Sequence, residues 1–110
     1  MSYEQLRVAL AAEGFFTHYR EDNDTLICTS EEWPNVPQRA HSFWVARRSD
    51  GWYLGTWAPR LYRIADASRI PALCIAWLRR YSTRAQWEVD ENTQREFQLS
   101  EIGAEDLPAE

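Results

Sequence analysis

The sequence predicts an α+β fold: a mainly antiparallel sheet of five or six strands, with an N-terminal helix and a later helix packed on one face. Two segments, near residues 3–13 and 70–81, have the apolar spacing of amphipathic helices. Between them lie short runs rich in aromatic and β-branched residues, separated by turn-forming residues. Such short connections favour antiparallel pairing of neighbouring strands.

The chain has 110 residues, which suits a single hydrophobic core. Residues 1–110 are therefore expected to form one α+β domain. A hydrophobic content of 45% with 26% charged residues is typical of a globular protein. Residues 104–110 are predicted to be a solvated acidic end.

The first helix is predicted over residues 3–13. Ser2 followed three residues later by Gln5 is a capping box, in which each side chain satisfies a backbone donor at the helix start. Gly14 suits the left-handed conformation in which many helices end. The residues that recur at helical spacing are Tyr3, Leu6, Ala9 and Leu10.

The first hairpin is predicted from residues 15–20 and 25–29. The Glu-Asp-Asn-Asp segment between them favours a turn, because short polar side chains bond to their own backbone. Residues 31–40 follow and contain two prolines, which cannot donate to a sheet ladder. That segment is predicted to be a loop or an irregular crossing at the sheet edge.

A second hairpin is predicted from residues 42–48 and 52–57. Asp50-Gly51 lies between them and tolerates the positive φ angles of a tight turn. A two-residue turn at this dipeptide and a three-residue loop that begins at Ser49 both fit, and they differ by one residue in register.

The next elements are a third strand of this meander and a second helix. Pro59 ends the preceding strand, and residues 61–64 resume the sheet. Asp66 or Ser68 caps the helix, and Pro71 suits its first turn because the missing N–H costs nothing there. One apolar stripe is expected to face the core, formed by Ile70, Leu73, Cys74, Trp77, Leu78 and Tyr81.

Beyond Ser82 the periodicity is weak. Trp87 and Val89 alternate with polar residues in the manner of a strand, as do Phe97 and Leu99. Only two helices are therefore predicted in the whole chain.

Charge is distributed unevenly along the sequence. Residues 1–38 carry seven acidic residues and two arginines. Residues 39–84 carry two acidic residues and nine arginines. Residues 85–110 carry eight acidic residues and one arginine. A basic middle can bind an anionic partner, but acidic flanks that fold back onto it produce the same pattern. We favour internal neutralisation.

The sequence favours a bacterial, cytoplasmic protein. Cys28 and Cys74 are far apart in the sequence, and each lies in an apolar run. This pattern is typical of buried free thiols in a protein of a reducing compartment. The N-terminal residues lack the apolar core of a signal peptide, and no apolar stretch reaches the roughly 20 residues that cross a bilayer. Every basic residue is an arginine, as expected from a GC-rich coding genome.

No catalytic residue, metal ligand or cofactor site is predicted. The two histidines, His18 and His41, and the two cysteines have none of the spacings of metal sites. A Gly-x-Ser-x-Gly elbow and a glycine-rich phosphate loop are both absent from the sequence. The isoelectric point near 5.0 argues against nucleic acid, because acidic flanks repel phosphates.

Aromatic residues on both faces of the second hairpin are the main functional signal. Two helices can cover only one face of the sheet, so the other is either covered by the 33–40 loop and the C-terminal segment or open to a partner. Gly55 within the strand predicts the close approach of another group, more often a Trp than a ligand. The candidate binding residues are Trp44, Arg47, Arg48, Trp52, Tyr53 and Trp57.

Three functions follow from these observations. The leading one is a non-enzymatic module that binds another protein, or itself as a homodimer, through the aromatic sheet face. The second is an immunity or inhibitor protein whose acidic surface binds a basic partner. The third is a small enzyme whose site the spacing rules do not capture.

Overall fold

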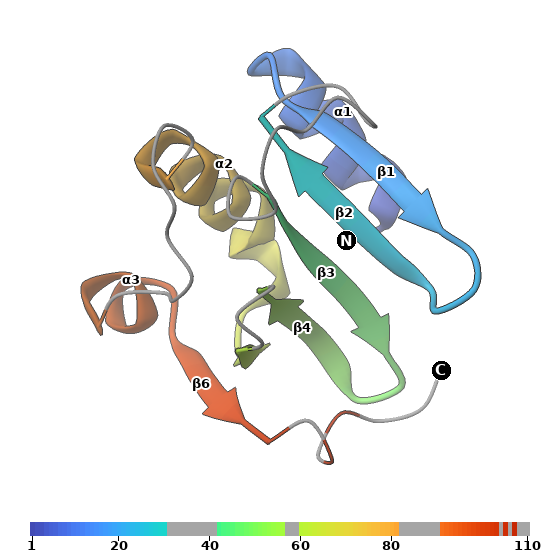
Figure 1. The fold of residues 1–110 in the computed structure, drawn as a ribbon. Coiled ribbons are helices and arrows are strands. Elements are labelled where there is room, and N and C mark those ends of the chain that lie inside the picture. The colour runs from blue at the N-terminus through green and yellow to red at the C-terminus, as the bar shows by residue number, and fades with distance from the viewer. Residues whose placement is uncertain (31–41, 57–59, 82–90, 104, 106, 108–110) are drawn as a thin grey trace.

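A computed structural model describes residues 1–30, 42–56, 60–81, 91–103, 105 and 107 of the chain (Figure 1). A 3-10 turn at Ala67–Arg69 precedes the second helix. The helices and strands, in chain order, are α1 (Tyr3–Ala12), β1 (Phe16–Arg20), β2 (Thr25–Thr29), β3 (Ser42–Arg48), β4 (Gly51–Gly55), β5 (Leu61–Ile64), α2 (Ile70–Tyr81), α3 (Glu91–Glu96) and β6 (Leu99–Ile102).

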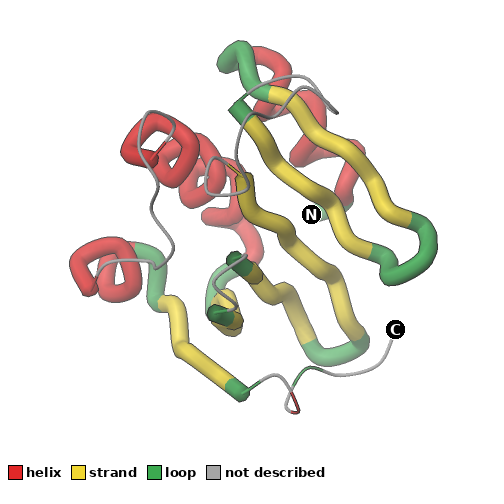
Figure 2. The backbone as a smooth tube through the Cα atoms, in the orientation of Figure 1, coloured by secondary structure: helices red, strands yellow, loops and turns green. Residues whose placement is uncertain are grey.

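The six strands form one sheet in which each strand lies beside its neighbour in the chain, in the order β1-β2-β3-β4-β5-β6. Every pairing is antiparallel. Helix α1 passes behind β1 and β2 in the view of Figures 1 and 2, and α2 packs on the same side through the shared core. The predicted α+β fold, with both main helices on one face of an antiparallel sheet, is confirmed.

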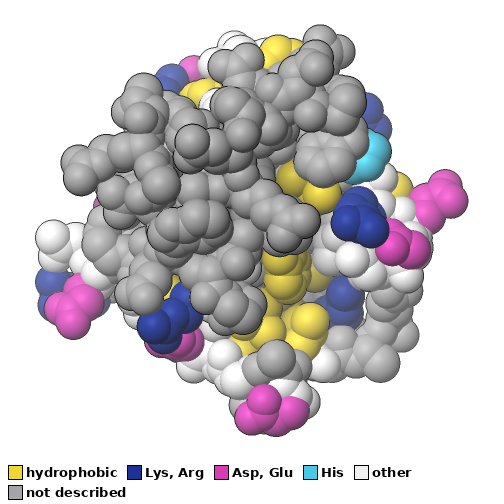
Figure 3. Space-filling view, viewed as in Figure 1, with side chains coloured by type: hydrophobic (Ala, Val, Ile, Leu, Met, Phe, Trp, Pro, Cys, Tyr) yellow, Lys and Arg dark blue, Asp and Glu magenta, His cyan; other side chains and the backbone are white. Residues whose placement is uncertain are grey.

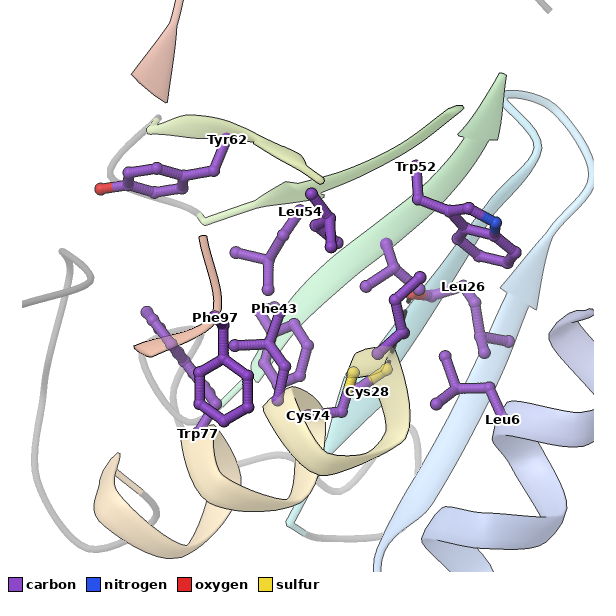
Figure 4. Close-up of a cluster of buried hydrophobic side chains, with 14 of the residues drawn as sticks. Leu6, Leu26, Cys28, Phe43, Trp52, Leu54, Tyr62, Cys74, Trp77 and Phe97 are labelled. Carbon is purple, nitrogen blue, oxygen red and sulfur yellow. Dashed lines mark hydrogen bonds between the residues drawn. The ribbon is translucent and has the colours of Figure 1, made fainter. Parts of the chain in front are cut away.

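The core lies between the helices and this side of the sheet, which we call the first face. Strand residues of the first face, such as Leu26, Val45 and Leu54, are fully buried. Phe43 of β3 meets Trp77 of α2 edge to face, with ring centroids 5.5 Å apart. Figure 4 shows how side chains from α1, α2 and the strands converge there. The predicted stripe of α2 is buried at Ile70, Leu73, Cys74, Trp77 and Leu78.

The predicted start of the first helix is confirmed, although α1 ends at Ala12 and not at residue 13, and only the Ser2 half of the capping box forms. The Ser2 hydroxyl accepts a hydrogen bond from the backbone N–H of Gln5 at 3.2 Å, which satisfies one of the free donors at the start of α1. Gly14 takes a φ of 83° two residues after the end of the helix. Asp66 caps the 3-10 turn by accepting from the backbone N–H of Ser68 at 3.0 Å.

The turn of the second hairpin differs from both predicted loops. Arg48 pairs with Gly51, so the two-residue turn is Ser49-Asp50 and not Asp50-Gly51. Asp50 is not among the residues with positive φ, whereas Gly51, which follows the turn, has a φ of 146° and so uses the freedom predicted for the glycine of this dipeptide. The register differs by two residues from that of the predicted two-residue turn and by one residue from that of the three-residue loop. A shift of two keeps each side chain on its predicted face, because the side-chain period of a strand is two.

A third, short helix was not predicted. Helix α3 spans Glu91–Glu96, a polar segment with too few apolar residues to show a helical period. Phe97 follows α3 and is buried outside any strand, whereas Leu99 begins β6. The prediction of one strand through both residues was therefore wrong for Phe97. The predictions for the 31–40 loop and for Trp87 and Val89 lie outside the described residues.

Acidic side chains of both flanks pair with arginines of the basic middle. Glu13 pairs with Arg79, and Glu101 accepts from Arg60 at 2.7 Å. Both pairs are exposed, so each contributes only about 0–1 kcal/mol. They are nonetheless consistent with internal neutralisation, because they join flank and middle through the fold.

Candidate functional site

The side of the sheet opposite α1 and α2, which we call the second face, is covered at its centre. Ile27, Ala46 and Tyr53 point to this side and are at most 2% exposed. Figure 3 looks onto the second face and shows hydrophobic side chains near its middle, with basic and acidic side chains beside them on the side of the β1–β2 hairpin. The choice between a covered and an open second face is thus decided for these central residues.

A cavity of about 230 Å³ lies on the second face, over the strands β1, β2 and β3. Its described lining comes from three parts of the chain that are far apart in sequence: the first hairpin, β3 and Leu107. The register brings them together, since Arg20 pairs with Thr25 and Ile27 pairs with Trp44. The described lining residues are Arg20, Asn23, Thr25, Ile27, Trp44, Arg48 and Leu107.

Arg48 is the most buried charged group of this lining, with only 5% of its side chain exposed. Its Nη1 donates to the carbonyls of Asp24 and Arg47, both at 3.0 Å, and its Nη2 donates to the carbonyl of Asn23 at 3.0 Å. The Nε–H is buried and has no hydrogen-bond partner. One donor of a buried guanidinium therefore has no acceptor in the protein, which is rare in folded proteins.

Asp24 holds the turn that carries this part of the site. It adopts a φ of 48°, a left-handed conformation that Asp tolerates better than most residues. Its carbonyl accepts from the Tyr3 hydroxyl at 2.9 Å as well as from Arg48, and its carboxylate accepts from the Tyr19 hydroxyl at 2.7 Å. This last hydrogen bond, with partial desolvation, raises the pKa of Tyr19 to about 12. The turn is thereby fixed to α1, β1 and β3 at once.

The first hairpin supplies the polar side of the cavity. Arg20 donates to both carboxylate oxygens of Asp22, from Nε at 3.3 Å and from Nη2 at 3.0 Å. Thr25 donates through its hydroxyl to the amide oxygen of Asn23 at 2.7 Å. No carboxylate belongs to the described part of the lining, although its two arginines form ion pairs with Asp22 and Asp24 beside it.

Trp44 supplies the aromatic part of the wall. Its indole lies across Gly55, the residue directly opposite on β4, where a Cβ would overlap ring carbons. The prediction that Gly55 makes room for a Trp is confirmed. Because the ring is only half-buried, part of its surface remains open to a partner.

Of the six predicted binding residues, the structure brings Trp44 and Arg48 together in the cavity. Arg47 is exposed and belongs to the first-face side of β3, where its backbone N–H donates to the Tyr3 hydroxyl at 2.8 Å. Trp52 lies on the first face at 6% exposure, with its ring 5.4 Å from that of Tyr3, edge to face. Its ring is part of the core and offers little surface to a partner.

The remaining two predicted residues are Tyr53 and Trp57, and Tyr53 is not part of the described lining. Tyr53 is on the second face but only 2% exposed, and its hydroxyl donates to the carboxylate of Asp50 at 2.9 Å. Burial and this hydrogen bond raise the pKa of Tyr53 above its ordinary value. Trp57 lies outside the described residues. Whether any of the six binds a partner stays a prediction.

Sequence reasoning missed five residues of the lining. Four of them belong to the first hairpin, and their proximity to Trp44 depends on the pairing of β2 with β3, which are separated by a long connection. No short-range pattern fixes such a register. Leu107 was expected in a solvated end, yet it is half-buried in the lining, whereas the nearby Glu105 is exposed as predicted. The missed residues are Arg20, Asn23, Thr25, Ile27 and Leu107.

The cavity offers groups that can hold a bound ligand. Its described lining has hydrogen-bond donors and apolar walls but no His, Cys, Asp or Glu. His18 pairs with Ile27 and not with Cys28 across the hairpin. Within the described ranges, no three side chains of the metal-binding types gather into a group that could hold an ion.

Comparison with known proteins adds no relative: no family model, no curated protein and no solved structure matches the chain. None of the helices within the described residues combines the length and the apolar character that crossing a bilayer requires. Proposals about function therefore depend on the fold and on the cavity of the second face.

Proposed function

We propose that this protein is a non-enzymatic binding module, which recognises another protein through the second face and receives one side chain of that partner in the cavity. The observation that carries the proposal is the size and composition of the cavity. At about 230 Å³ it is smaller than the roughly 300 to 1,000 Å³ of pockets that enclose small-molecule ligands. A volume of this size suits one anchor side chain of a larger partner.

The residue types of the lining support recognition of a protein. Trp and Arg are enriched among the residues that dominate protein interfaces, and they act best when held in a packed surrounding. Trp44 is held by its contact with Gly55, and Arg48 by three backbone carbonyls. Both are thus ordered before a partner arrives, which lowers the entropic cost of binding.

The other functions that the sequence left open have less support. The exposed acids Glu13 and Glu101 already pair with arginines of the same chain, which reduces the acidic surface available to a basic partner. An enzymatic role is not supported by any group of catalytic side chains among the described residues of the cavity. A homodimer remains within the proposal, since a second copy is one kind of protein partner.

Affinity purification from the source cells tests this function. The tagged protein, its Trp44→Ala variant and a Val8→Ala variant are compared by quantitative mass spectrometry. Val8 is a fitting control because it is 61% exposed on α1, which lies on the opposite side of the sheet. Circular dichroism and thermal unfolding establish that each variant is folded.

We expect a partner whose recovery falls roughly 30-fold or more with Trp44→Ala, as loss of a hot spot worth about 2 kcal/mol requires. Recovery with Val8→Ala should equal that of the parent. If the second copy is the partner, sedimentation equilibrium should show a dimer that Trp44→Ala dissociates. A monomer at every concentration, with all recovered proteins retained equally by both variants, would rule out the proposed function.

A further inference from the structure

We propose that the anchor received by this cavity carries a carboxylate on a short apolar stem, recognised by Arg48 and Arg20; the inference rests on the proposed function. The first supporting observation is the unmatched donor. Arg48 lines the cavity, and only 5% of its side chain is exposed. Its Nε–H has no acceptor. A buried donor without a partner is costly, and an acceptor that enters the cavity removes the cost.

The charge of the lining selects an anionic acceptor over a neutral one. Its described residues include two guanidinium groups and no carboxylate. Asp24 Oδ2 lies 3.9 Å from Nη1 of Arg48, an ion pair that is too long for a hydrogen bond, so the three hydrogen bonds of that guanidinium all go to neutral carbonyls. Hydrogen bonds from arginine to a carboxylate are about twice as strong as those between neutral groups.

Arg20 is placed to contribute a second guanidinium. Its side chain is 41% exposed, and its present partner Asp22 is 65% exposed. An exposed pair of this kind contributes little to stability, so its exchange for a carboxylate in a less hydrated cavity has a low cost. Arg20 can therefore move from Asp22 to a bound anion without disturbing the sheet.

The apolar walls explain why the anion should have a stem. Ile27, Trp44 and Leu107 form the remainder of the lining together with Asn23 and Thr25. An inorganic anion would leave these apolar surfaces without contact, whereas a chain of a few carbons covers them. A glutamate side chain and the C-terminal residue of a peptide share this chemistry.

Titration of the full-length, ¹⁵N-labelled protein tests the inference directly. Butyrate is compared with butyramide, which has the same shape and no charge, and with acetate, which lacks the stem. The readouts are the Nε–H signal of Arg48 and the indole N–H signal of Trp44. Butyrate should shift both signals, while butyramide and acetate should bind at least tenfold more weakly.

Two neighbouring arginines provide matched variants. Arg48→Gln should abolish the effect of butyrate, whereas Arg47→Gln should leave it unchanged because Arg47 is exposed and does not line the cavity. Arg48 also supports the fold, so Arg20→Gln is the second variant, and it should weaken butyrate binding severalfold in a folded protein. Equal binding of butyrate and butyramide, or no effect of Arg20→Gln, would overturn the inference.

Two peptides distinguish the sources of the carboxylate. One is acetyl-Gly-Leu with a free C-terminus, and the other is acetyl-Gly-Glu-Gly amide, whose only carboxylate is a side chain. Binding of either supports the inference and identifies the source, and binding of neither contradicts it. If neither butyrate nor the two peptides bind, but Trp44→Ala still loses a protein partner, this inference is wrong and the proposed function is unaffected.

Discussion

The indole ring of Trp44 occupies the space beside Gly55, its partner across the β3–β4 ladder, where the Cβ of any larger residue would lie. Glycine weakens a strand by roughly 0.5 to 1 kcal/mol relative to alanine. Its presence here is explained by the ring, which forms one wall of the cavity on the second face. The position of a binding residue is thus set by its cross-strand neighbour.

Gly55→Ala should destabilise the protein by about 1–3 kcal/mol, because the added methyl group forces the Trp44 ring out of place. In a Trp44→Ala background the same change should be neutral or stabilising by roughly 0.5 kcal/mol, since only the strand preference remains. Urea unfolding of the four proteins in this double-mutant cycle measures both values. Equal costs in the two backgrounds would show that the ring does not require the glycine.

Arg48→Met should cost about 2–3 kcal/mol, because it removes the charged donor that three backbone carbonyls share. Arg47→Met is the matched control and should stay within about 0.5 kcal/mol, since that side chain is exposed. Chemical denaturation followed by circular dichroism gives both free energies of unfolding. A similar small change for both variants would contradict the structural role of Arg48.

Tyr19 should titrate with a pKa of about 12, raised because its hydroxyl donates to the carboxylate of Asp24. The unfolded chain loses this proton near pH 10.0. The stabilisation is therefore complete below pH 10.0 and is lost as the pH rises towards about 12. NMR of ¹³Cζ-labelled tyrosine follows the titration, and Asp24→Asn should lower the pKa towards 10.0 while keeping the left-handed turn. An unchanged pKa in that variant would disprove the assignment.

Cys28 and Cys74 should not react with Ellman's reagent in the native protein. Both are fully buried, and Figure 4 shows their sulfur atoms close together between β2 and α2. Burial and the hydrogen bond with Cys74 raise the pKa of the Cys28 thiol well above 9.0. In the unfolded chain this thiol ionises near pH 9.0, so its contribution to stability holds below that pH and declines above it. Two thiols should react in denaturant, and rapid labelling of either one in native buffer would refute the burial.

Local sequence signals were sufficient for the elements that depend on local physics. The capping box at Ser2, the turn before Thr25 and the apolar stripe of α2 each involve residues within a few positions of one another. The faces of the second hairpin were also predicted, because alternation survives a register shift of two. Its turn was not, since Ser49, Asp50 and Gly51 all favour turns and the sequence does not show which two of them form it.

The candidate site was predictable only in part. Trp44 and Arg48 could be identified because they lie on the hairpin with the strongest pattern. Arg20 and Ile27 reach the same cavity through the pairing of β2 with β3, a contact between segments that the sequence does not place side by side. Trp52 was assigned to the candidate surface because aromatic composition does not reveal which face the helices cover.

The order of the strands in the sheet also has a consequence for how the chain folds. Because each strand pairs with the strand next to it in the sequence, the hairpins β1–β2 and β3–β4 close short loops at a low entropic cost, whereas β6 joins β5 only after α2 and α3 have been made. The helices do not share this advantage. Helix α1 is made before any strand, but its core partner α2 begins only at Ile70, so the apolar side of α1 must wait for most of the chain to emerge.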